Sequence, residues 1–144
     1  MVEFAIVLPI LVILFFGFVE IGRALYQENL LTKAIVTGTR YVARVPDAVT
    51  DTCQPGPDWA AASTHGIDLV VHAGTGVVRL PGLDDAGAVS FSIQANSVGG
   101  ETACVVQGQA RAQFAAIFGE SVVPLLKLGS IPLTANAEER FIGE

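Results

Sequence analysis

The chain has 144 residues, of which 51% are hydrophobic and only 15% are charged, and its formal net charge is −6. Residues 1–45 carry four basic and three acidic residues, whereas residues 46–144 carry four basic and eleven acidic residues. An acidic chain with isolated basic residues is unsuited to displacing counterions from phosphates, which argues against nucleic-acid binding. The length suits one modest domain, residues 46–144, behind an N-terminal anchor and stalk, residues 1–45.

The first predicted element is an apolar helix that begins after Glu3. Its charge-free run, Phe4 to Val19, has 16 residues, just below the roughly 17 to 25 that usually span a bilayer. A carboxylate in or near hydrocarbon costs about 3 kcal/mol, so Glu3 either has a partner and a task or snorkels at the end of the span.

The charges around this run bear on topology. Basic residues lie only after it, so the positive-inside rule would place the head in the cytoplasm unless a basic leader before Met1 has been removed. We therefore interpret the chain as a mature form. A secretory signal peptide is disfavoured, because no basic region precedes the run and no small-residue cleavage site follows it.

The second predicted element is an amphipathic helix, Ile21 to Val45, that continues the first without a break. Together the two parts would reach about 65 Å, so part of the helix must project from a small head. Pro9 should kink or unwind the apolar half. Gly17 and Gly22 either allow neighbouring helices to approach closely or simply reflect the frequency of glycine in membrane helices.

The chain then turns into the head. Residues 46–57 are rich in proline, aspartate and threonine and are expected to form a surface connection. Asp58 is expected to cap a short helix that Gly74 to Gly76 would stop. One face of this helix would hold Trp59, Ala62, Gly66, Leu69 and Val70.

Beyond the short helix, apolar and polar residues alternate with a period of two, which predicts half-buried strands. The alternation is found at Val89–Asn96, Val106–Phe114 and Ile131–Ala137, and Val77–Leu80 is a plausible fourth strand. The short separations favour an antiparallel sheet whose apolar face is covered by the long helix, and hence an α+β fold. The apolar stretch Phe114–Leu128 is either an exposed contact loop or a short helix folded onto the sheet.

The two cysteines, Cys53 and Cys104, are well separated and lie beyond the apolar anchor. A bridge between them would stabilise the head by roughly 4 kcal/mol in the chain-entropy model, and the membrane context favours it over two buried thiols. His65 and His72, with Asp68 between them, do not complete the ligand set that zinc requires. Because no nucleophile–base pattern or phosphate loop is present either, we expect neither an enzyme nor a resident metal or cofactor.

The N-terminal residues resemble those of a known family. The stretches Val2–Pro9 (VEFAIVLP) and Gly17–Tyr26 (GFVEIGRALY) are similar to the opening of TadE-like pilins of tight-adherence (Flp-type) type IV pili. Residues 38–41 (GTRY) and the closing strand Ile131–Arg140 also suit the family, so about a third of the chain carries the resemblance. The family glutamate stands fifth in a mature pilin, whereas Glu3 is third, which leaves open whether Met1 is the mature start.

The resemblance implies a structural protein. A prepilin peptidase would cut the precursor, the helix would reside in the inner membrane, and the assembly machinery would extract it into an extracellular filament of this chain and other pilins that supports surface adhesion. The carboxylate of Glu3 would neutralise the N-terminal amine of a neighbouring subunit, since each charge buried alone is costly. The alternative from another class is a monomeric, membrane-anchored binding domain, and within the pilin hypothesis a major subunit and a minor or tip subunit both remain open.

Overall fold

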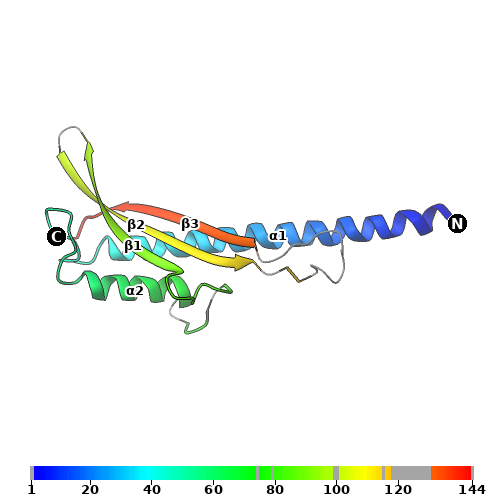
Figure 1. The fold of residues 1–144 in the computed structure, drawn as a ribbon, viewed down its shortest axis with the longest axis horizontal. Helices are drawn as coiled ribbons and strands as arrows, with labels where there is room; N and C mark the ends of the chain where they lie inside the picture. The colour runs from blue at the N-terminus through cyan, green and yellow to red at the C-terminus, as the bar shows by residue number, and fades with distance from the viewer. Residues whose placement is uncertain are drawn as a thin grey trace.

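The molecule is built around one long N-terminal helix. The computed structural model describes residues 2–73, 75–78, 80–98, 101–114, 116–117 and 131–143. Helix α1, Val2–Val42, has 41 residues, and its N-terminal half projects from the head, which is built around its C-terminal half (Figure 1). The predicted merger of anchor and stalk into one helix that extends beyond the head is confirmed.

The helix is continuous through Pro9, so of the two predicted effects the local unwinding does not occur, and the kink stays a prediction. A proline removes one backbone donor and crowds the carbonyl four residues earlier. That local loss does not end a helix of this length, because hydrogen bonds continue on both sides of it.

The sheet has three antiparallel strands in the order β1-β2-β3. The strands are β1 (Val89–Val98), β2 (Glu101–Phe114) and β3 (Ile131–Arg140). In the register, Val89 pairs with Ala110, and Ala110 pairs with Ala135. The expected α+β arrangement is confirmed, but residues 77, 78 and 80 are not in a strand. Val77 is exposed and Leu80 is buried, so this short segment contributes one core side chain and no sheet pairing.

Helix α2, Trp59–His72, lies beside α1 on the same side of the sheet (Figure 1). Its buried residues are Ala62, Gly66, Val70 and Val71, close to the predicted face. Two details of its ends differ from prediction. Asp58 occupies the N-cap position as predicted, but its side chain makes no capping hydrogen bond, and the left-handed residue that ends the helix is Ala73, whose N–H donates to the Leu69 carbonyl.

The core lies between the helices and the apolar face of the sheet. One cluster joins Leu31 and Ile35 of α1 to Val71 of α2 and to Phe114 and Leu133 of the sheet. A second cluster, near the C-terminal end of α1, contains Val42, Ala48, Val49, Ala62 and Val106. The segment 46–57 was expected to be a surface connection, and this is wrong for Ala48 and Val49, which are buried because they fill the end of the core.

Candidate assembly surface

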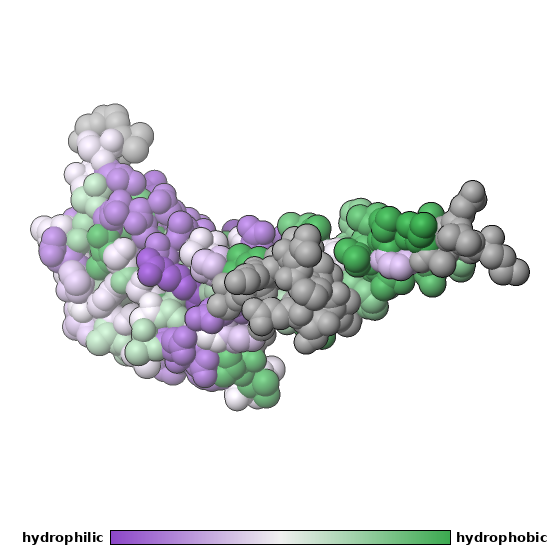
Figure 2. Space-filling model, turned by 45° about the vertical axis from the view of Figure 1, so that its right-hand side comes forward, coloured by the Kyte–Doolittle hydropathy of each residue, from purple (hydrophilic) through white to green (hydrophobic). Residues whose placement is uncertain are grey.

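The N-terminal half of α1 exposes a continuous apolar surface. Its large apolar side chains are open to solvent at almost every position, with Phe4 68% and Phe18 71% exposed. Figure 2 shows this half as a hydrophobic rod beside a predominantly hydrophilic head. Exposed apolar surface of this extent indicates an interaction with lipid or with other protein chains.

The same stretch satisfies the requirements for a membrane span. Within the described residues, Ile6–Val42 is a helix long and apolar enough to cross a membrane, and only 6% of its most apolar window is buried in the molecule. The core helix of a water-soluble domain would hide that face against its own fold. The described part of the head does not cover these apolar side chains, which favours an anchor.

Of the residues predicted to act in assembly, those that the structure describes belong to this rod. Met1 falls outside the described residues, and Glu3 and Pro9 belong to the first turns of α1, with the Glu3 side chain not described. A Cβ added at Gly17 or at Gly22 would meet no atom within 4 Å. Both glycines therefore leave the helix backbone accessible from outside, as close approach of another helix requires.

A buried carboxylate marks the place where the rod enters the head. The Glu20 side chain is only 5% exposed, and its Oε2 accepts a hydrogen bond of 2.9 Å from Arg23 Nη1. Glu20 Oε1 accepts a hydrogen bond of 2.7 Å from the backbone N–H of Ile117, just after β2. The Arg23 guanidinium lies over the Phe114 ring, 5.5 Å from its centroid. Glu20 thus ties the end of the sheet to α1 by charge-assisted hydrogen bonds.

From the sequence, Glu20 was identified only as part of the stretch Gly17–Tyr26 that resembles the TadE-like family. The local signal for its role was available: Glu20 and Arg23 are three positions apart, a spacing at which helical side chains meet. Its partner Ile117 is distant in sequence, so the burial of the carboxylate depends on the tertiary fold.

The predicted disulfide is present between Cys53 and Cys104. It joins the loop that follows α1 to β2 at Cys104, next to Val105, where β3 stops pairing with β2. The hairpin formed by β1 and β2 extends beyond β3, because the β3 register ends at Val105 paired with Arg140, and its strand ends at Val98 and Glu101 project from the body of the head (Figure 1). The bridge therefore fixes the root of a projecting two-stranded element.

The histidines do not form a metal site with other residues in the described part of the chain. His72 Nδ1 lies 2.9 Å from Asp68 Oδ1, whereas the ring of His65 packs edge-on against Tyr41. No group of three or more His, Cys, Asp or Glu side chains suited to a metal occurs among the described residues.

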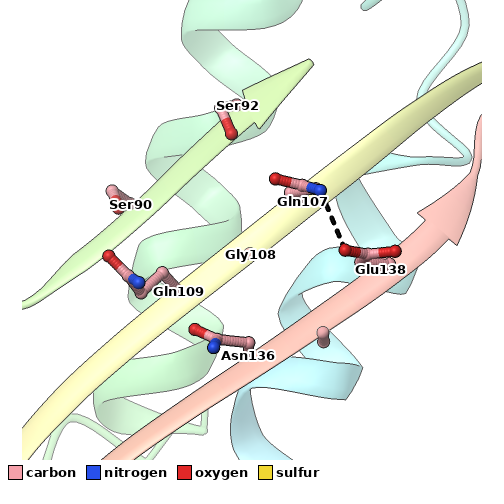
Figure 3. A pocket seen from close by; sticks show the side chains of 8 residues that line it. Ser90, Ser92, Gln107, Gly108, Gln109, Asn136 and Glu138 are labelled. Carbon is pink, nitrogen blue, oxygen red and sulfur yellow. Dashed lines mark hydrogen bonds between the residues drawn. The ribbon is translucent and has the colours of Figure 1, made fainter. Parts of the chain in front are cut away.

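A polar groove crosses the outer face of the sheet. It has a volume of about 240 Å³ and is lined by Ser90, Ser92, Gln107, Gly108, Gln109, Asn136, Ala137 and Glu138. Figure 3 shows hydroxyl and amide side chains from all three strands on the face away from the helices, with Gln107 Nε2 donating to Glu138 Oε1 at 2.8 Å. The lining offers hydroxyl, amide and carboxylate groups that can form hydrogen bonds.

Comparison with known proteins places the N-terminal segment in a family. Residues 1–40 match the family described as TadE-like protein. The N-terminal segment is therefore similar to that of TadE-like proteins. The match ends within α1 and covers the apolar rod, the glycines and the Glu20–Arg23 pair. No curated protein and no solved structure matches the chain.

The TadE-like match confirms the resemblance read from the sequence and associates the chain with Tad pili. Together with the exposed apolar helix, it also indicates membrane anchoring through α1. The remaining 104 residues, from 41 to 144, lie outside the match. The family match therefore gives no information on what the head contacts.

Proposed function

We propose that this chain is a pilin, a structural subunit that polymerises through α1 into an extracellular Tad-like type IV pilus supporting surface adhesion. The observation that carries the proposal is the apolar rod. It is continuous with the core of a folded head, so one element serves first as a membrane anchor and then as the packed centre of a filament. A rod that has left the bilayer needs other apolar helices to cover it.

The first turns of α1 would organise this packing. Glu3 would pair with the N-terminal amine of a neighbouring subunit, because either charge left alone in an apolar filament core would be strongly unfavourable. Gly17 and Gly22 would let neighbouring helices approach closely. A prepilin peptidase would generate the amine, and the Tad assembly machinery would extract the helix from the inner membrane. The role is structural, and we propose no enzymatic activity.

A minor or tip pilin is the second candidate, favoured by the β1–β2 hairpin that projects from the head. A subunit at the end of a filament presents surfaces that a repeating subunit must bury. A monomeric anchored binding domain would instead use the polar groove of the sheet and would leave the rod in lipid.

Substitution of Glu3 tests the proposal. We expect Glu3→Ala to remove the chain from filaments sheared off the producing cells while the protein stays in the membrane with its disulfide formed. Glu28→Ala is the matched control, since Glu28 is an exposed carboxylate on the same helix and should assemble normally. Normal filament incorporation of the Glu3→Ala chain would contradict polymerisation through the helix start and favour the anchored domain.

A further inference from the structure

Five large apolar or aromatic side chains are exposed at the level where the rod enters the head. They come from α1 and from the strand ends beside it, and their exposed fractions are Ile21 59%, Leu25 54%, Tyr26 69%, Ile117 65% and Ile131 41%. We call these five residues the apolar collar. Single exposed apolar residues are ordinary, whereas a group of them at one level of a molecule indicates a contact surface.

Two contacts hold the strand ends at this level of α1. The backbone N–H of Ile117 donates to Glu20 Oε1 at 2.7 Å. Ile131 pairs with Phe114 across the sheet, and the Phe114 ring lies 5.5 Å from the Arg23 guanidinium. Figure 1 accordingly shows the end of β2 and the start of β3 directed toward the exposed half of α1. The collar therefore has a fixed position relative to the rod.

The spacing of charges along α1 places the collar in the headgroup layer of a bilayer. Between Glu3 and Glu28, the charged residues of the helix are Glu20 and Arg23, which pair with each other. The interval from Glu3 to Glu28 is 25 positions, or about 38 Å of helix. A bilayer with its headgroups is about 40 to 45 Å thick, and its hydrocarbon is about 30 Å thick. If the hydrocarbon takes the charge-free run Phe4–Val19, the collar begins in the interfacial layer.

The chemistry of the collar suits this layer. Tyr26 has the amphipathic ring that is enriched at membrane–water interfaces. The strand ends beside the collar, residues 112–117 and 131–137, contain no charged residue. The Glu20 carboxylate is buried against Arg23 and the Ile117 N–H, so its charge is paired before the helix enters the hydrocarbon.

We propose that the apolar collar docks the head on the surface of the bilayer, with Ile117 and Ile131 inserted among the lipid headgroups. The rod brings the collar to this depth in every anchored molecule, so lipid covers it without a further protein partner. The head then sits directly on the membrane in one orientation, because the Glu20 hydrogen bond holds the end of β2 against α1. This contact goes beyond the proposed function: it belongs to the anchored state and does not depend on polymerisation.

Tryptophan quenching in vesicles tests the contact. The full-length chain is reconstituted in phosphatidylcholine vesicles whose acyl chains carry bromine, a quencher, either near the headgroup or near the chain end. Because Trp59 is the only tryptophan, Trp59→Phe provides a background in which Ile117→Trp or Ile131→Trp reports on the collar alone. We expect the bromine near the headgroup to lower the emission of both variants at least about two-fold, as for an aromatic ring at the interface.

Ile142→Trp is the matched control at the far end of the head. Ile142 is 59% exposed, similar to Ile117, and its N–H donates to the Ala43 carbonyl at 3.1 Å. Ala43 follows Glu20 by 23 positions, or about 35 Å along a helix. The emission of this variant should not change with either lipid. Quenching of Ile142→Trp equal to that of Ile117→Trp would overturn docking through the collar.

Leu11→Trp separates the docking from the anchor. Leu11 is exposed in the middle of the rod, so bromine near the chain end should quench it most. Quenching of Leu11→Trp without quenching of either collar variant would overturn the docking and leave both the anchor and the pilin proposal intact. Blue-shifted but unquenched emission from the collar variants would show that protein covers the collar, and would overturn lipid as its partner. No quenching at Leu11 would overturn the anchor and the docking together.

Formation of the Cys53–Cys104 bridge, seen on a non-reducing gel, reports that each variant is folded. If one collar variant fails to form the bridge, the other decides the outcome, since Ile117 and Ile131 come from different strand ends.

Discussion

The crossing of α1 and α2 depends on two glycines, and Gly38→Ala tests it. A Cβ at Gly38 would lie 2.5 Å from Val70 Cγ2, 3.0 Å from the Gly66 carbonyl oxygen and 3.2 Å from Phe91 Cζ. Val70 is fully buried and the Gly66 oxygen belongs to the backbone, so neither can move aside easily. We therefore expect overpacking to cost about 3 kcal/mol in the free energy of unfolding, the upper end of the usual range.

The same substitution also removes a glycine from a helix, which stabilises by about 1 kcal/mol. The net expectation for Gly38→Ala is a loss of about 2 kcal/mol in the free energy of unfolding. Gly22→Ala provides the matched control on the same helix, because its Cβ would meet no atom within 4 Å. That variant should gain about 1 kcal/mol from helix propensity alone.

Thermal unfolding of the full-length chain in detergent micelles, followed by circular dichroism, measures the difference. At about 4 °C per kcal/mol, Gly38→Ala should unfold about 8 °C below wild type and Gly22→Ala about 4 °C above it. If Gly38→Ala unfolds at or above the temperature of Gly22→Ala, the helix crossing has room for a methyl group, and the expected overpacking is contradicted.

Three further substitutions test the interior of the head. Replacing Cys53 and Cys104 by serine opens a loop with a sequence separation of 51 and should cost up to about 4 kcal/mol in denaturant unfolding; an unchanged midpoint would contradict a stabilising role. Glu20→Ala leaves the Ile117 N–H without its charged acceptor and should cost about 1.5 to 3 kcal/mol, whereas a neutral result would show that the carboxylate does not hold the end of β2. Leu31→Ala creates a cavity at a fully buried position and should cost about 2 to 5 kcal/mol by the same assay, and a cost below that range would mean that the core closes around the missing side chain.

The elements that sequence analysis predicted best are those with a strong local pattern. The alternation at Val89–Asn96 and Ile131–Ala137 specified strands because a period of two exposes one face and buries the other. The apolar run and the amphipathic segment that follows it predicted one long helix, because no break separates them and the second part has the helical period. The disulfide was favoured by the membrane context, and the fold brings its two cysteines together.

The errors arose where tertiary contacts override local composition. The segment Val77–Leu80 was predicted as a strand from its residues, but its described residues 77, 78 and 80 pair with no strand among the described residues, and Leu80 is instead part of the core. Ala48 and Val49 lie in a stretch of turn-forming residues, yet the end of the core needs apolar side chains there. Neither outcome could be read from the segment itself.

The candidate assembly surface was predicted in part. A charge-free apolar run predicts an exposed rod, because a small head is not large enough to cover it. The burial of Glu20 was not foreseen, since its acceptor role depends on Ile117 and hence on the path of the chain after β2. The stretch Phe114–Leu128 was predicted to be either a loop or a helix. Residue 115 and the residues from 118 onward lie outside the described residues, so this prediction is not tested. Phe114 itself is buried at the end of β2.

Mass spectrometry of filaments sheared from the producing cells tests the central claim most directly. Intact-mass and peptide analysis would quantify this chain in the filaments and define its N-terminus. A pilin is expected in the filaments with a processed start, as the dominant protein for a major pilin or in small amounts for a minor or tip pilin. Recovery of the chain from membranes together with its complete absence from filaments would contradict assembly through α1 and leave an anchored domain.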